Sequence, residues 1–472
     1  MPSLRLLVWS LTLMAGFGLT AQDHSKFDFL QQYLNRDEYR IEGSIHHWKV
    51  HFSTEADFEF AKIYDIGYFD DAQFDSSAIF RKAVFNEVVY FRGAQFDSMA
   101  AFRGAEFQLL ANFHRSKFNY WAEFDYARFG YIAYFPEARF MDQSSFTNVV
   151  FGSRVDFRYA RFKKVHFSLT EFHGTTRFSY AVFMENTYFN GAIFSKDISF
   201  EYSRFRSDLS FANAQFDGNA SFRNVELPEI LSFESVKTAA TIDLTATRLD
   251  STLQAEGRFC RIDLRDAPIE KFKLRYDKFR VYQPTSINQT EYERLTNVYE
   301  GLLKNFKDHG YRTSYETLDK EYQAFKDMQN PDATVWKRIL NQANFYWNNY
   351  GYNKERIWLY TLGFFLFFYL INVFWLQRLA TQVFPIAAIS DRMTTNVYLQ
   401  SYALRKLHMF LWYRCTYAFY YTALIFFGLK VSTDQLNFDR PLSVFYIFLQ
   451  YTLGLICLGY LANFIIASGV IG

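Results

Sequence analysis

Phenylalanine recurs through the first half of the chain at steps that alternate between five and six residues. The series begins at Phe69 and keeps this alternation as far as Phe162. The residue two places before each Phe is nearly always small or apolar, and the residues between are largely polar. A period of eleven residues fits neither a helix, with a period of 3.6, nor a strand, with a period of 2. The pattern instead indicates a chain that turns a corner every five or six residues and buries one large and one small residue on each side.

Four such sides predict a coil of about 22 residues, and neighbouring coils should lie about 4.8 Å apart, the spacing of hydrogen-bonded strands. The core is then a set of ladders, Phe on Phe and Ala on Ala, packed without voids. Each buried Phe should contribute roughly 1.5–3 kcal/mol. The extra residue in alternate segments predicts two enlarged corners per coil. Two successive steps of five, from Phe162 to Phe167 and Phe172, predict a local irregularity.

Segments such as Ala94-Gln95-Phe96 and Ala105-Glu106-Phe107 resemble the pentapeptide-repeat family. The resemblance implies a right-handed quadrilateral β-helix, here cored by Phe, although the family's usual step is a regular five. We expect this β-solenoid over residues 52–272. Residues 22–51 are poor in the motif, and we expect them to cap the open end of the solenoid.

One aromatic ladder is predicted on the surface. Tyr159, Tyr180 and Tyr202 each follow a repeat Phe by two places and lie about one coil apart. They should therefore stack on one face. Two interpretations stay open: a binding strip, or a structural ladder at the corners of the coils.

The first 21 residues have the features of an export signal. Arg5 precedes a short apolar run from Leu6 to Leu19, and cleavage is expected after Ala21. An uncleaved anchor is the alternative. Both place the solenoid outside the cytoplasm, which in a bacterium is the periplasm.

Residues 287–355 change to a helical pattern, which predicts an α-helical neck that serves as a packed spacer or carries oligomer contacts. Two uncharged stretches, 357–376 and 442–467, are long enough to span a bilayer. A third, 410–429, contains Arg414 and is either a span or a re-entrant helix. The lipid bilayer is therefore an expected partner.

Charge predicts the orientation of these segments. The stretch between 357–376 and 410–429 contains four basic residues, Arg378, Arg392, Arg405 and Lys406, and a single acid, Asp391. An excess of basic residues marks cytoplasmic loops. The solenoid would then be extracytoplasmic, with the bacterial inner membrane as the expected location.

The C-terminal part also resembles bacterial fusions in which pentapeptide repeats precede a two-helix ion-channel module. The resemblance implies a pore loop near Gly428, Leu429 and Lys430. The carbonyl-lined potassium filter of such channels is missing from this stretch, and Lys430 would repel cations. Only the topology of the channel module is therefore carried over.

The sequence contains no recognisable catalytic, cofactor or metal site. His46, His47 and His51 are the densest histidine group. They are interpreted as surface residues before the first coil, with a transition-metal site as the alternative. The net charge of +2 gives no reason to expect a nucleic-acid partner. We therefore expect a non-enzymatic, membrane-anchored protein whose solenoid is a binding or scaffold surface for an unknown protein partner. The alternative is a homo-oligomeric, ion-channel-like pore with the solenoid as its outer domain.

Overall fold

The computed structural model describes residues 40–41, 44–330, 334–350, 352, 355–386, 389–391, 407–429 and 440–469. The predicted signal peptide (1–21), most of the predicted cap (22–51) and Lys430 lie outside the described residues. Contacts divide the chain into two units, Met1–Tyr322 and Gln323–Gly472, which are described separately.

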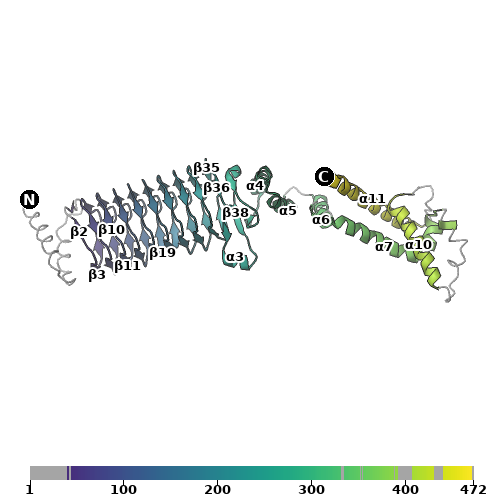
Figure 1. The fold of residues 1–472 in the computed structure, drawn as a ribbon, viewed down its shortest axis with the longest axis horizontal. Coiled ribbons are helices and arrows are strands. Elements are labelled where there is room, and N and C mark those ends of the chain that lie inside the picture. Colours follow the sequence, from purple (N-terminus) through teal and green to yellow (C-terminus); the bar gives the residue numbers. More distant parts are fainter. Residues whose placement is uncertain are drawn as a thin grey trace, which may run out of the picture. The chain divides into compact units, whose positions relative to one another are not determined.

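The first unit is a parallel β-solenoid built almost entirely of two-residue strands (Figure 1). One face holds ten strands, from β1 (Arg40–Ile41) to β35 (Lys237–Thr238). A second holds eleven, from β2 (Ile45–His46) to β39 (Phe272–Lys273). The other two faces join into one 19-stranded sheet, which ends at β40 (Phe279–Val281). The predicted solenoid is confirmed, and its strands extend beyond both predicted ends, residues 52 and 272.

The Phe ladders form as predicted. Strands β11 (Gln95–Phe96) and β15 (Lys117–Phe118) pair residues that are 22 apart, so that Phe96 lies beside Phe118. Successive rings in a ladder stack with centroids between 4.5 and 5.3 Å apart. Rings from opposite faces meet edge to face across the core, as Phe102 and Phe113 do at 5.5 Å and 89°. Stacked and edge-to-face pairs are the favoured aromatic geometries, so the ladder adds to the energy of burial.

Each coil has two kinds of corner. At the tight corners two residues separate a Phe from the next buried small residue, as between Phe69 and Ala72. The Ala72 N–H donates to the Phe69 carbonyl at 3.2 Å, and Asp71 has a φ of 52°, which makes a type II turn. At the wide corners three residues intervene, as between Phe74 and Ala78, and the chain makes an open bend. The expectation of two enlarged corners per coil is confirmed.

The predicted irregularity is also present. After Phe162 only Lys163 and Lys164 precede the next buried residue, Val165, at a corner that elsewhere holds three residues. Here the chain runs straight through the corner as the six-residue β22 (Arg161–His166). It pairs with the seven-residue β19 (Arg139–Ser145), and the register shifts between them. The rings on either side are accordingly 21 residues apart, as for Phe146 and Phe167.

Helices cover the C-terminal end of the solenoid. A short helix, α3 (Ser251–Ala255), is inserted before the last strands. α4 (Gln289–Asp308) begins at Asn288, whose side chain accepts a hydrogen bond from the N–H of Glu291, and α5 (Arg312–Gln329) follows. The apolar face of α4, which includes Leu295, Leu302 and Phe306, is buried. The predicted neck (287–355) is therefore divided: α4 and most of α5 belong to the solenoid unit, and α6 (Val335–Asn348) belongs to the second unit.

The second unit packs three long apolar helices together. α7 (Arg356–Arg378) continues into a π-helical turn (Leu379–Val383), and α10 (Leu407–Phe426) and α11 (Pro441–Gly469) pack against it. Arg356–Val383 and Pro441–Ala462 are long and apolar enough to cross a membrane. These two stretches contain or overlap the predicted segments 357–376 and 442–467. The third predicted segment, 410–429, corresponds to α10 and the turn that ends it.

Candidate functional site

The predicted tyrosine ladder is present on the solenoid. Tyr159 stacks on Tyr180 with centroids 4.9 Å apart and an interplanar angle of 9°, and Tyr180 stacks on Tyr202 at 4.9 Å and 2°. The three rings are 52%, 44% and 41% exposed. Each residue occupies the third position of a tight corner with φ near +60°. The ladder is thus a row of corner residues and also an exposed aromatic edge three coils long.

A buried acidic residue lies on the strand before this ladder. Asp156 is inaccessible to solvent and accepts hydrogen bonds from Arg158 Nε at 2.9 Å and Arg158 Nη2 at 2.8 Å. Arg154 contributes a longer contact at 3.4 Å. The hydrogen bond to Asp156 raises the pKa of Arg158. Both arginines stay partly exposed, so one carboxylate holds two cations at the surface.

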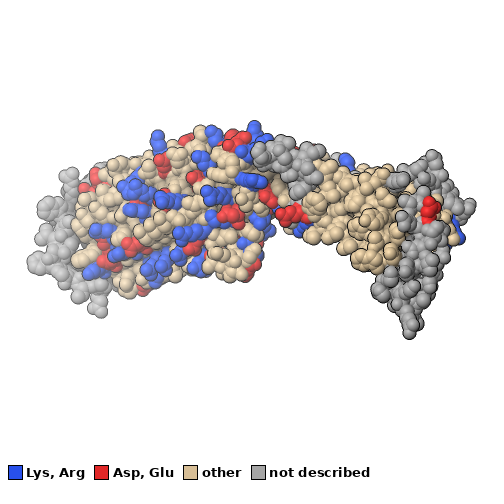
Figure 2. Space-filling view, turned by 45° about the vertical axis from the view of Figure 1, so that its right-hand side comes forward, with Lys and Arg blue, Asp and Glu red and all other residues tan. Residues whose placement is uncertain are grey.

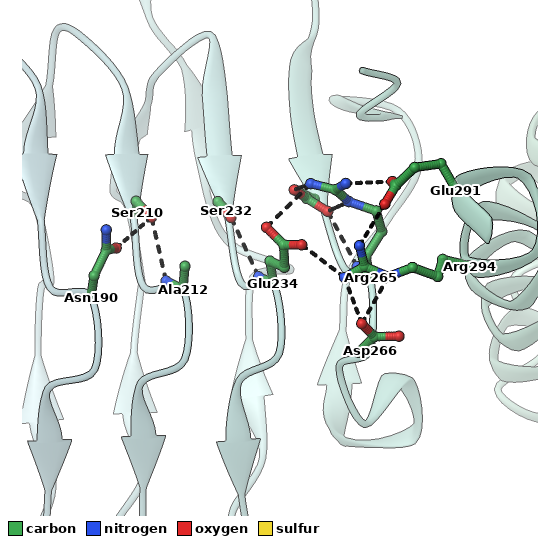
Figure 3. A network of polar contacts seen from close by, with 10 residues as sticks. Asn190, Ser210, Ala212, Ser232, Glu234, Arg265, Asp266, Glu291 and Arg294 are labelled. Atoms are coloured by element: carbon green, nitrogen blue, oxygen red, sulfur yellow. Dashed lines mark hydrogen bonds and ion pairs between the residues drawn. The ribbon is translucent and has the colours of Figure 1, made fainter. Parts of the chain in front are cut away.

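A second network joins the end of the solenoid to α4 (Figure 3). Arg265 donates to Asp263, Glu234 and Glu291, and Arg294 donates to Glu234, Asp266 and Glu291. Hydrogen bonds to Asp263 and to Asp266, respectively, are the main causes of the raised pKa values of Arg265 and Arg294. All these charges are used in holding the helix to the solenoid, which indicates a structural role.

The carboxylate of Glu321 on α5 is largely buried and accepts hydrogen bonds from two tyrosines. The hydroxyl groups of Tyr276 and Tyr299 donate to its carboxylate at 2.8 and 3.0 Å. Burial raises the pKa of Glu321, and the two tyrosine hydrogen bonds oppose that shift. The contact fixes α5 to the last strands of the solenoid.

The helical unit contains a buried polar cluster that the sequence analysis did not predict. Asn372 of α7 donates to Thr422 Oγ1 of α10 at 2.8 Å and to Gln450 Oε1 of α11 at 3.2 Å. Tyr446 donates to Asn372 Oδ1 at 2.8 Å, and Gln450 donates to the Thr422 carbonyl at 3.1 Å. The signal in the sequence is an amide side chain within each of two largely apolar segments, Asn372 in 357–376 and Gln450 in 442–467. The cluster ties three helices together through side chains that satisfy one another.

Gly428 and Leu429 of the predicted pore loop end α10. The N–H of Gly428 donates to the Ile425 carbonyl at 3.1 Å, and the N–H of Leu429 donates to the Leu424 carbonyl at 3.0 Å. With Gly428 at a φ of +65°, this is a Schellman cap, a common way for a helix to end at glycine. Lys430 lies outside the described residues, so the pore loop itself stays a prediction.

The histidines do not converge on a metal site. His46 stacks on Tyr68, and His51 forms a hydrogen bond with Asp75 at 2.6 Å. The ring of His47 is partly buried and packs on the core rings of Phe52, Phe58 and Phe69. The interpretation of His47 as a surface residue is wrong, because it occupies the Phe position of its coil, 22 residues before Phe69. Among the described residues, no three His, Cys, Asp or Glu side chains are placed to hold a metal ion.

Comparison with known proteins identifies the repeat. Residues 80–128, 135–182 and 178–226 match the family model for pentapeptide repeats (9 copies). No curated protein and no solved structure matches the chain. The matched residues lie within the coils whose Phe ladders and two-residue strands are described above. The solenoid of this chain is therefore a pentapeptide-repeat domain.

Proposed function

We propose that this chain is a non-enzymatic, membrane-anchored protein that presents its pentapeptide-repeat solenoid as an extracytoplasmic binding or scaffold surface. In a bacterium the helical unit would lie in the inner membrane and the solenoid in the periplasm.

The exposed apolar surface of the helical unit is the observation that carries this proposal. Only 28% of the most apolar stretch of each of the two candidate spans is buried. Large side chains such as Leu359, Phe374 and Trp375 on α7, and Leu442 and Phe445 on α11, are more than half exposed. Figure 2 shows that charged side chains gather over the solenoid, whereas the visible surface of the helices is almost free of them. Exposed apolar surface of this extent is unfavourable in water and suits lipid.

The polar groups of the helical unit support the same interpretation. Asn372, Thr422 and Gln450 are buried and bonded to one another, as polar side chains within a bilayer must be. Arg414 donates to the backbone carbonyl groups of Val373 and Phe374 near the end of α7. A helix of the length of α10, 20 residues, extends about 30 Å and can cross the hydrocarbon core. We therefore favour three spans over a re-entrant helix.

The solenoid supports a surface role. Its interior is filled by Phe and small residues, and its outward positions form flat rows of polar and aromatic side chains. The alternative of an oligomeric pore gains no support from the described residues, because the polar side chains of the bundle bond one another and Gly428 closes a helix.

Extraction of membranes with alkaline carbonate tests the anchor. The full chain should stay in the membrane pellet, and a chain truncated after Gln329, which keeps the solenoid and its helical cap, should be released. Release of the full chain would refute the proposal. Retention of the truncated chain would assign the anchor to the N-terminal segment instead of the C-terminal helices.

A further inference from the structure

Positive charge is concentrated where the solenoid is irregular. Residues 139–177 contain seven Lys or Arg and three Asp or Glu, a net charge of +4, whereas the whole chain carries +2. This segment includes the two long strands, β19 and β22, that run through a corner of the coil. The excess of positive charge therefore lies in the same segment as the irregular corner of the solenoid.

Two of these cations, Arg139 and Arg161, form a ladder with Lys117 of the preceding coil. Lys117 is paired in register with Arg139, and Arg139 with Arg161, on adjacent parallel strands. The rings beneath them, Phe118, Phe140 and Phe162, stack at 4.7 and 4.9 Å, which sets the spacing of the coils. Among the described residues none of the three cations has an acidic partner within ion-pair distance, whereas nearby Lys163 is paired with Asp142 at 3.0 Å.

Like charges in register on neighbouring strands repel and lower the stability of a sheet. Arg139 and Arg161 are exposed, so no burial offsets this cost. An anionic ligand lying along the ladder would be attracted by all three cations and would offset the repulsion among them. We propose that the strip formed by Lys117, Arg139 and Arg161 binds an anionic polysaccharide.

The shape of the strip favours an extended polymer. The cations are distributed over three coils, and the straight run of β22 extends the flat surface through the corner. Lys164, within this run, adds a further cation with no acidic partner among the described residues. Lys- and Arg-rich surface patches are a known mode of binding for sulfated polysaccharides.

The tyrosine ladder begins on the coil of Arg161, the last cation of the strip, and favours sugar over other anions. Tyr159 is two residues before Arg161 on the same coil, and Tyr180 and Tyr202 continue the row. Half-exposed tyrosines offer both an apolar ring edge and a hydroxyl group, which suits the mixed surface of a sugar ring. The inference rests on the proposed function, because an extracytoplasmic solenoid meets glycans and does not meet nucleic acid.

Binding of the purified full chain, in a neutral detergent, to immobilised heparin tests the proposal. Wild-type protein should bind heparin with an affinity that falls as salt rises, and should not bind uncharged dextran. The triple variant Lys117→Gln/Arg139→Gln/Arg161→Gln should weaken heparin binding about tenfold, since three charge contacts are lost.

A matched control removes the same amount of charge from another face. Lys62, Arg128 and Lys237 all point outward from the ten-stranded sheet, and Lys62→Gln/Arg128→Gln/Lys237→Gln should leave heparin affinity unchanged. The ladder variant should also melt at or above the wild-type temperature, because a repulsion is removed. This separates lost binding from lost folding.

Equal loss of affinity in both triple variants would overturn the proposal, because net charge alone would then explain binding. Displacement of heparin by polyglutamate at equal charge concentration would also overturn it, in favour of an acidic protein partner. The heparin-binding assay uses detergent-solubilised protein without a membrane, and the carbonate extraction uses no polysaccharide. Failure of the polysaccharide proposal and failure of the anchor are therefore distinguishable.

Discussion

Truncation of one ladder residue, Phe118→Ala, should open the solenoid locally. Phe118 is fully buried, with its faces against Phe96 at 4.8 Å and Phe140 at 4.7 Å and its neighbour Phe124 edge-on at 6.0 Å. Replacing a buried Phe by Ala usually costs 3–5 kcal/mol. Here two stacked pairs are lost as well, each worth about 0.5–1.5 kcal/mol, so we expect a cost of about 5 kcal/mol.

The cavity left by Phe118→Ala should not collapse, because backbone hydrogen bonds before and after residue 118 hold its coil to the preceding coil. The N–H of Lys117 donates to the Ala94 carbonyl and that of Asn119 to the Phe96 carbonyl, both at 2.8 Å. Each coil contacts only its neighbours, so the loss should stay local, as in other repeat proteins. Phe118→Leu is the matched control and should cost less than about 2 kcal/mol, since Leu227 occupies the same kind of position.

Hydrogen exchange measured by mass spectrometry reports this directly. In Phe118→Ala, amides of residues 95–140 should exchange about a thousandfold faster, while those of residues 200–227 keep wild-type protection. A uniform change along the solenoid, or a local change below about 1 kcal/mol, would refute the stacked-ladder account.

Three further perturbations test other parts of the structure. Burial, with a smaller contribution from His46, lowers the pKa of His47 to about 4. Because an unfolded histidine titrates near 6.5, stability should fall by roughly 3 kcal/mol as pH drops from 6.5 to 4, and the loss should cease below pH 4. His47→Phe should abolish that dependence in thermal unfolding, and persistence of the dependence would contradict the assignment. A Cβ at Gly454 would lie 1.7 Å from the Phe426 carbonyl oxygen, so Gly454→Leu should separate α10 from α11 and lower the melting temperature in detergent; an unchanged temperature would argue against this packing. Lys82 has a φ of 52°, so Lys82→Gly should stabilise the solenoid by roughly 0.5 kcal/mol in chemical unfolding, and destabilisation would show that the side chain contributes more than the strain costs.

The solenoid could be predicted because one short period determines its corners, its core and its irregularity. The steps from Phe162 to Phe167 and Phe172 were enough to locate the straight run of β22. The start of the solenoid was missed because His47 replaces Phe in the first described coil. The amphipathic pattern of α4 predicted a helix correctly, but such a pattern does not specify what its apolar face packs against, here the end of the solenoid.

The polar cluster of the helical unit could not be predicted in the same way. Asn372 contacts Thr422 and Gln450, which are 50 and 78 residues away, and no repeat relates them. The cationic ladder differs, because Lys117, Arg139 and Arg161 are spaced by one coil. The ladder could therefore have been predicted from the sequence, by comparing the charges of residues that are one coil apart on the same face.

The central claim is that a membrane anchor presents the solenoid outside the cytoplasm, and labelling of a single surface cysteine tests it most directly. Arg128 is exposed on the solenoid, while native Cys260 is buried. A membrane-impermeant maleimide should label Arg128→Cys in intact bacterial cells with a permeabilised outer membrane as fully as after lysis, with the unsubstituted chain as background. Labelling of this cysteine only after lysis would place the solenoid in the cytoplasm and contradict the account.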